Sequence, residues 1–240
     1  MKLCIVVIAS YGKEYDELLA LWRSIRYPAW VTVKFIFADP DHPESISMTG
    51  DTIIMRGKEC YYPGIHYKTV AAMEYLLKNE EFDYLLRSNL SSFFNTESLL
   101  TFLDDKPRTN AMFGKSMFDR FLSGSGYIMT RDVVEKFVQW DCSDEVNPMR
   151  MYDDEVVGVF MLQNAIPYYT WDWEDAATLK DTKAIHIRCH CERGFVRVDP
   201  LYGWDITTSA SPEYFREQVE RYNARICTRL DTSDQVGAQQ

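Results

Sequence analysis

The chain begins with an apolar run, KLCIVVIA (residues 2–9), and a short polar segment, SYG, follows it. The run is rich in β-branched residues and too short for a helix, so it predicts a buried β-strand. After the polar segment, Leu18, Trp22 and Ile25 recur at the spacing of one helical face. Alternating apolar residues at 31–37 then predict a second strand. A strand, a helix and a strand in this order predict parallel strands joined by a crossover helix.

The same alternation continues along the chain. Further strands are predicted at residues 51–55, 82–87, 111–113, 125–129, 166–170 and 184–188. Helices are predicted at residues 14–26, 67–78, 96–103 and 153–163, after Thr130 and from Ser211. We therefore expect an α/β fold in which helices flank an open, mostly parallel sheet. No linker interrupts the pattern, so we predict one domain over residues 1–229 and a flexible C-terminal tail over residues 230–240, which carry few apolar side chains.

The composition excludes several classes of protein. Of the 240 residues, 46% are hydrophobic, enough for a sizeable core without disulfide bonds or a structural metal. The 26 Lys and Arg residues against 36 Asp and Glu residues give a net charge of −10, which argues against nucleic-acid binding. No apolar run approaches the length of about 18 residues that a membrane-spanning helix needs. The 6 cysteines are scattered, as free thiols in a reducing compartment are, and the first run fits a strand better than a signal peptide, so we expect a cytoplasmic protein.

Polar residues follow the predicted strands at the carboxyl ends, where parallel α/β sheets bind their ligands. Ser10 and Tyr11 follow the first strand, and Asp39 follows the second, where an Asp can bind a ribose or a base. The alternative for Asp39 is a turn-forming residue. Lys68 begins a helix, where a cation strengthens a natural anion site, and Arg87 ends a strand. Their alternatives are an exposed helix lysine and an ion-paired arginine.

The order of several segments is more specific than any residue alone. They are ECYYPGIHYKT (59–69), FDYLLR (82–87), SNLSSFFN (88–95), SGSGYIMT (123–130) and DDEVVG (153–158). This series resembles the GT-A glycosyltransferases, specifically the β-1,3-galactosyltransferase and Fringe-like group, which shows Lys-Thr, Ser-Gly-x-Gly-Tyr and Glu-Asp-Val-x-x-Gly segments. The compact form is similar to the small glycosyltransferases of large DNA viruses of algae. The resemblance spans residues 2–190 and implies a GT-A, Rossmann-like sheet.

The resemblance implies an inverting glycosyltransferase, either a hexosyl- or a pentosyltransferase. Its donor is expected to be a nucleotide sugar, with UDP as the nucleotide, and its acceptor a glycan hydroxyl. By motif position, Asp154 is the base that takes the acceptor proton, with Asp153 beside it. The alternative for both is ordinary acidic charge at a helix N-terminus. Three adjacent acids also repel one another, which predicts a raised pKa for at least one of them.

The carboxyl-edge rule, the aromatic residues and the resemblance together indicate which residues bind the two substrates. The donor is expected at Ser10, Tyr11, Asp39, Lys68, Arg87, Ser88, Asn89 and Arg188. The acceptor is expected at Ser123, Gly124, Trp171 and Trp173. Aromatic faces stack on sugar rings, and the acids beside the tryptophans can bind hydroxyl groups. The alternative for the tryptophans is packing in the core.

One segment departs from the family pattern. The family has an Asp-x-Asp that bridges a divalent metal to the donor diphosphate, whereas this chain has Asn89-Leu90-Ser91. Asn and Ser oxygens can ligate Mn²⁺ or Mg²⁺ but lack the charge that makes binding strong. We therefore expect a metal that is weakly bound, with Ser91 and His186 as ligands, or dispensable. In the second case, cations neutralise the leaving diphosphate, and the candidates are Lys68, Arg87, Arg188 and Arg193. The alternative for His186 is a buried structural histidine.

The segment HIRCHC (residues 186–191) is rich in metal-binding residue types. As a strand, it places His186 and Arg188 on one face and Cys189 and Cys191 on the other, which disfavours a four-ligand zinc site. A competing function is a catalytically inactive module that binds a nucleotide sugar or a glycan on the same fold. A nucleotidyltransferase is disfavoured because no Gly-rich phosphate loop follows the first strand. The sequence predicts no particular sugar, acceptor, linkage or oligomeric state.

Overall fold

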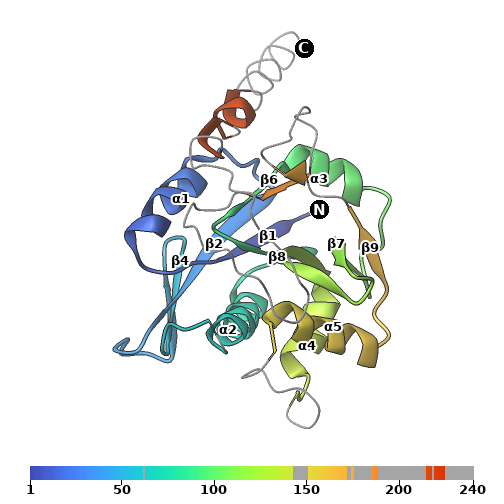
Figure 1. Ribbon diagram of the computed structural model, residues 1–240, viewed down its shortest axis with the longest axis horizontal. Coiled ribbons are helices and arrows are strands. Elements are labelled where there is room, and N and C mark those ends of the chain that lie inside the picture. Colours follow the sequence, from blue (N-terminus) through green and yellow to red (C-terminus); the bar gives the residue numbers. More distant parts are fainter. Residues whose placement is uncertain are drawn as a thin grey trace.

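The computed structural model describes residues 1–61, 63–142, 151–171, 174–175, 185–188, 215–217 and 219–224. The strands of its main sheet are β1 (Leu3–Ile8), β2 (Val31–Asp39), β3 (Ile46–Thr49), β4 (Thr52–Arg56), β5 (Tyr84–Asn89), β7 (Met112–Met117), β8 (Phe121–Thr130) and β9 (Tyr168–Thr170). They form one eight-stranded sheet in the order β3-β4-β2-β1-β5-β8-β7-β9 (Figure 1).

The sheet is mostly parallel. β1 pairs in parallel with β2 on one side and with β5 on the other, and β2 pairs in parallel with β4. β7 and β9 are parallel to each other, whereas β3 and β8 are antiparallel to their neighbours. The predicted α/β fold with an open, mostly parallel sheet is therefore confirmed. The carboxyl ends of β1, β2 and β5 lie at one edge, where such sheets bind ligands.

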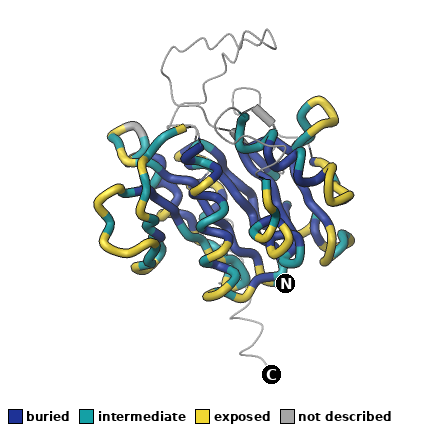
Figure 2. Tube along the Cα trace, turned by 90° about the horizontal axis from the view of Figure 1, so that it is seen from below, coloured by how far each residue is buried: buried dark blue, intermediate teal, exposed yellow. Residues whose placement is uncertain are grey.

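Helices cover both faces of this sheet, and the strands between them are buried (Figures 1 and 2). The helices are α1 (Lys13–Ser24), α2 (Gly64–Asn79), α3 (Thr96–Leu103), α4 (Arg131–Gln139) and α5 (Asp153–Gln163). Residues 215–217 and 219–224 are also helical. α1, α3 and the last helical residues pack with Leu3, Ile5 and Val7 of β1, whereas α2, α4 and α5 pack with the alternate residues Cys4 and Val6. The alternation of a strand therefore divides the core into two layers.

A small second sheet lies beside the main one. It contains β10 (Glu174–Asp175), β11 (His186–Arg188) and β6 (Ser92–Phe94) in that order. β11 pairs antiparallel to β6, so that His186 lies opposite Phe94 and Arg188 opposite Ser92. Because β6 directly follows β5, this pairing brings the late strand to the carboxyl edge of the main sheet.

Several strands differ from the sequence prediction, which lacks the short strands β6 and β10 and ends β7 before Met117. β8 begins at Phe121 instead of Ser125, so Ser123 and Gly124 lie within a strand. Serine and glycine favour strands weakly, but β5 and β7 pair with this strand on either side and override the weak propensity. The sequence does not predict β3, which forms a hairpin with β4 around Gly50, whose φ is 62°.

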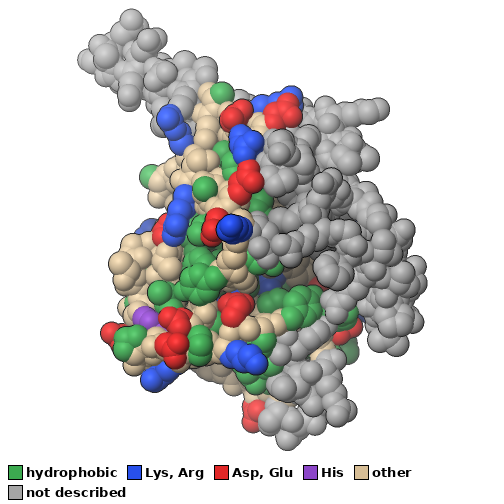
Figure 3. Space-filling model, turned by 60° about the vertical axis from the view of Figure 1, so that its left-hand side comes forward, with side chains coloured by type: hydrophobic (Ala, Val, Ile, Leu, Met, Phe, Trp, Pro, Cys, Tyr) green, Lys and Arg blue, Asp and Glu red, His purple; other side chains and the backbone are tan. Residues whose placement is uncertain are grey.

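No described helix is long and apolar enough to cross a membrane. On the face shown in Figure 3, Lys and Arg side chains are interspersed with Asp and Glu side chains. The described side chains of that face therefore form no continuous basic surface of the kind that binds nucleic acid.

Candidate active site

Two clusters of polar residues lie at the carboxyl edge of the sheet. The Glu59 cluster consists of Ser10, Glu59 and Lys68. The Asp154 cluster consists of Arg87, Asn89, Gly124, Asp153 and Asp154. Most of these residues were predicted from the sequence, but their pairing was not.

The Glu59 cluster connects the end of β1 to α2. Glu59 Oε1 accepts a hydrogen bond from Lys68 Nζ at 2.6 Å and one from Ser10 Oγ at 3.2 Å. Lys68 Nζ also donates to the Ala9 carbonyl at 2.8 Å. Burial lowers the pKa of Lys68, and the hydrogen bond and charge of Glu59 oppose that shift. One cation and one carboxylate therefore balance each other at this point.

Lys68 is at the predicted edge but in a different role. Its side chain is 1% exposed, so it is neither an exposed helix lysine nor a cation open to a diphosphate. The ammonium group instead fixes Glu59 and the end of β1 to the first turns of α2.

Tyr11 and Asp39 lie beyond the ends of β1 and β2, as predicted. Tyr11 is 58% exposed, and its ring lies 4.8 Å from the ring of Phe37. Asp39 Oδ1 accepts a hydrogen bond from the Asp41 N–H at 2.9 Å, which is the turn-forming role weighed as its alternative.

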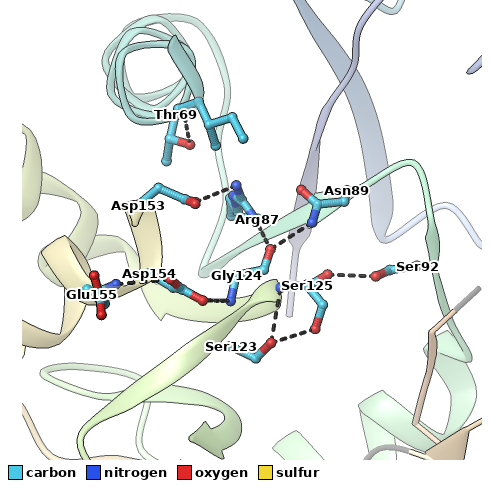
Figure 4. Close-up of polar contacts among 11 residues, drawn as sticks. Thr69, Arg87, Asn89, Ser92, Ser123, Gly124, Ser125, Asp153, Asp154 and Glu155 are labelled. Atoms are coloured by element: carbon cyan, nitrogen blue, oxygen red, sulfur yellow. Dashed lines mark hydrogen bonds and ion pairs between the residues drawn. The ribbon is translucent and has the colours of Figure 1, made fainter. Parts of the chain in front are cut away.

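The Asp154 cluster joins β5, β8 and the first turn of α5 (Figure 4). Arg87 is 1% exposed, and its Nη2 forms an ion pair with Asp153 Oδ2 at 2.6 Å. Its Nη1 donates to the Gly124 carbonyl, and Asn89 Nδ2 donates to the same oxygen at 3.0 Å. The Gly124 N–H donates to Asp154 Oδ2 at 2.9 Å. Gly124 therefore connects the end of β5 with the acids of α5. Arg87, like Lys68, is paired and not open to a diphosphate.

Asp154 has the most unusual ionisation in the cluster. Burial raises the pKa of Asp154 to about 6, the charge of Asp153 adds to the rise, and the Gly124 N–H bond and Arg87 oppose it. Repulsion between the acids was predicted, but burial is the larger cause. A carboxyl group with a pKa close to the working pH is suited to accept a proton during a reaction.

The two glycines of the SGSGY segment allow close approaches. A Cβ on Gly124 would lie 3.2 Å from Asp154 Oδ2 and 3.3 Å from its Cβ. A Cβ on Gly126 would clash with the ring of Phe94. The neighbouring Ser123 and Ser125 are buried and share a hydrogen bond between their hydroxyl groups at 2.9 Å. The first glycine therefore lets α5 place Asp154 against β8, and the second lets β6 cross the strand.

The segment Asn89-Leu90-Ser91 does not fit a carboxylate-type metal site. No three His, Cys, Asp or Glu side chains come together in the part of the chain that the structure describes. The side chains of Asn89 and Ser91 are neutral, and Asp153, the nearby acid, is paired with Arg87. The buried hydroxyl of Ser88 donates to the Asn89 carbonyl at 3.2 Å. We therefore derive no catalytic step through a metal ion.

Two further residues predicted for the site are buried. His186 is 0% exposed, and its ring stacks on Phe94 in the second sheet with the centroids 4.3 Å apart, whereas its role as a metal ligand stays a prediction. Trp171 is 5% exposed and packs edge-on against Phe94 and Phe102, which is the core packing weighed as its alternative. The backbone of Arg188 pairs with Ser92 near the edge. Trp173, Arg193, Cys189 and Cys191 lie outside the described residues.

The sequence analysis did not single out three residues near these clusters. Glu59 pairs with Lys68, and its position in the segment before α2 was the available signal. Tyr127 closes the SGSGY segment and is buried, and its ring centroid lies 5.8 Å from Arg87 Cζ. His66 of α2 is 8% exposed, and burial lowers its pKa while Asp153 opposes the shift.

Comparisons with known proteins give similar solved structures only. No protein-family model matches the chain, and no curated protein matches it. A glycosyltransferase involved in the glycosylation of the major capsid of PBCV-1 has a TM-score of 0.48 and 12% identity, over 91% of this chain and 99% of that chain. The galactosyltransferase LgtC, solved with donor and acceptor sugar analogs, has a TM-score of 0.48 and 10% identity, over 91% of this chain and 95% of that chain.

Proposed function

We propose that the chain is a glycosyltransferase that moves a sugar from a nucleotide sugar, with UDP as the nucleotide, to a glycan hydroxyl with inversion at the anomeric carbon. The observation that carries this proposal is the Asp154 carboxylate, which a strand N–H holds at the carboxyl edge of the sheet and whose pKa is raised to about 6. The segments that resemble glycosyltransferases support it, because Arg87, Gly124 and Asp153 from three of them share one network.

In this reaction, Asp154 takes the proton of the acceptor hydroxyl while its oxygen attacks the anomeric carbon. The bond from that carbon to the diphosphate oxygen breaks, and the nucleoside diphosphate leaves with the electron pair. The nearby carboxylate also stabilises the oxocarbenium-like transition state. Asp154 then loses its proton to solvent.

The residues at the ends of β1, β2 and β5 bind the donor in this proposal. Ser10, Tyr11 and Asp39 contact the nucleoside in this proposal, and Ser88, Asn89 and Arg188 lie toward the diphosphate. Lys68 and Arg87 are already paired with carboxylates, so in this proposal they stabilise the geometry of the site and do not neutralise the leaving group. Ser123 and Gly124, beside Asp154, border the acceptor. The cytoplasmic location expected from the sequence stays a prediction.

A second candidate is a module that binds a nucleotide sugar or a glycan without catalysis. The neutral side chains of Asn89 and Ser91, where the related enzymes have acids, favour it. It predicts binding of the donor with no release of nucleotide.

The test is a panel of nucleotide sugars, with and without glycan acceptors, in Mn²⁺ and in chelator, with nucleotide release as the readout. We expect release from one donor class, and a loss of about 10²–10⁴-fold in kcat for Asp154→Asn. Glu155→Gln is the matched control, because a glutamine oxygen can still accept the Tyr152 N–H that Glu155 Oε2 accepts at 3.0 Å. Donor binding without release in any condition would establish the binding module. Full activity of Asp154→Asn would reassign the base.

A further inference from the structure

The backbone carbonyl and the backbone N–H of Gly124 both form hydrogen bonds in the Asp154 cluster. Its carbonyl accepts from Arg87 Nη1 and from Asn89 Nδ2 at 3.0 Å, and its N–H donates to Asp154 Oδ2 at 2.9 Å. Two donors from β5 therefore fix the orientation of the residue that holds the carboxylate (Figure 4).

The side-chain amide of Asn89 donates a hydrogen bond to the Gly124 carbonyl, which an ionised carboxylate cannot do. An amide NH₂ donates to a carbonyl, whereas an ionised carboxylate only accepts. An aspartate at this position would direct a negative oxygen at the Gly124 carbonyl, at a distance that is now 3.0 Å from Asn89 Nδ2. The residue that departs from the family's Asp-x-Asp is thus matched to its surroundings.

We propose that Asn89 is a positioning residue, whose side chain fixes Gly124 and thereby aims the Gly124 N–H at the Asp154 carboxylate. This inference rests on the proposed function for its effect on the reaction, but its effect on the Asp154 carboxylate exists without it. It competes with the view that Asn89 is a weakened metal ligand, and the two views predict opposite results for an aspartate at this position.

The test compares Asn89→Asp and Asn89→Ala with Ser91→Asp. Ser91→Asp is the matched control, because it adds the same charge two residues later in the segment without replacing the donor to Gly124. In both Asn89 variants we expect kcat to fall by about 10-fold or more, as displaced reacting groups do. The KM for the donor is expected to change less than kcat, and Mn²⁺ is expected to restore no activity. Asn89→Asp with higher activity than the wild type in Mn²⁺ would overturn the proposal.

A second readout is independent of activity. The groups that act on Asp154 are Arg87 of β5, Asp153 and Glu155 of α5, and the buried Tyr127 of β8. A loosened Gly124 N–H bond no longer lowers the pKa of Asp154, so NMR titration of its carboxyl carbon is expected to show a higher pKa in Asn89→Ala. An unchanged pKa in folded Asn89→Ala would contradict the positioning role. A raised pKa in a chain that transfers no sugar would keep the positioning role and refute the proposed function.

Discussion

Two buried cations of the described residues lie at the carboxyl edge of the sheet, and they differ in the acids around them. Among the acids that the structure describes, Lys68 forms an ion pair with Glu59 alone, at 2.6 Å. Arg87 pairs with Asp153 at 2.6 Å, while Asp154 and Glu155 follow in the same helical turn. The Glu59 cluster is balanced, and the Asp154 cluster has more carboxylates than cations.

This difference explains where a reactive group can arise. A carboxylate that is matched by a cation keeps its proton affinity low, because the cation stabilises the charged form. Asp154 is buried beside Asp153, and Arg87 is already engaged with that neighbour, so the pKa of Asp154 rises to about 6. The balanced cluster is therefore suited to structure and binding, and the unbalanced cluster to proton transfer.

The largest expected effect comes from removal of each cation in turn. Arg87→Met leaves Asp153, only 15% exposed, without a partner, and we expect it to lower the free energy of unfolding by about 3–5 kcal/mol. Lys68→Met leaves Glu59, which is 33% exposed and can be hydrated, so about 1–3 kcal/mol is expected. Urea unfolding of both variants measures the two values.

The double variant Arg87→Met/Asp153→Leu serves as the control for this prediction. Replacement of both members of a buried pair by apolar residues is often close to neutral, so it should recover much of the stability lost in Arg87→Met. If Arg87→Met and Lys68→Met lower the free energy of unfolding equally, the two clusters do not differ in how they compensate a carboxylate that has lost its cation.

The next effect concerns the pH dependence of stability in Asp154→Asn. The pKa of Asp154 is raised from 3.8 to about 6, so the folded wild type binds this proton more tightly than the unfolded chain does and loses stability as the pH rises from about 4 to 6. Asparagine carries no such charge. We expect Asp154→Asn to be more stable than the wild type by about 1–2 kcal/mol at pH 8, at about 1.4 kcal/mol per pKa unit less the lost hydrogen bond.

The advantage of Asp154→Asn is expected to disappear at pH 4, where Asp154 is protonated in the folded wild type. Unfolding curves at both pH values measure it. A variant less stable than the wild type at pH 8 would mean that the Asp154 carboxylate is well stabilised in the folded chain, which would contradict a pKa raised by burial and by the charge of Asp153.

The sequence predicts most of the fold because the deciding patterns are local. The run at residues 3–8 forms β1, and the apolar spacing at Leu18 and Trp22 forms α1. The helix predicted at Asp153–Gln163 begins and ends at those residues. β3 and the full length of β8 were not predictable in this way, because both depend on pairing with strands far away in the chain or across a turn.

The site could be predicted as a set of residues but not as a network. Ser10, Arg87, Asn89 and Asp154 follow from the carboxyl-edge rule and from the segment order. The burial of Arg87 and its ion pair with Asp153 depend on tertiary structure, because the two residues are 66 positions apart in the chain. Burial of Trp171 and His186 likewise depends on tertiary contacts with Phe94, and no local pattern distinguishes such a ring from an exposed one.

A smaller effect sharpens the role of charge within the Asp154 cluster. Asp153→Asn removes the like charge that raises the pKa of Asp154 and leaves Arg87 free to act on it. The acid limb of the kcat/KM profile is therefore expected to move to lower pH than in the wild type. Burial lowers the pKa of His66, and the charge of Asp153 opposes that shift, so Asp153→Asn is also expected to disfavour the charged form of His66. Rates measured across roughly pH 4–9, the range that brackets these groups, test this prediction. A shift of the acid limb to higher pH would show that the charge of Asp153 does not raise the pKa of Asp154.

The smallest effect is expected at the balanced cluster. Ser10→Ala removes the hydrogen bond of 3.2 Å to Glu59 Oε1, while Lys68 still neutralises that carboxylate at 2.6 Å. We expect a loss of about 0.5–1.5 kcal/mol in stability. If Ser10 contacts the nucleoside, the KM for the donor rises while kcat is unchanged, because uniform binding is lost. Initial rates at varied donor concentration separate the two constants. A fall in kcat alone would show that the Glu59 cluster also takes part in the chemical step. The assignment of binding to the Glu59 cluster and of proton transfer to the Asp154 cluster would then be wrong.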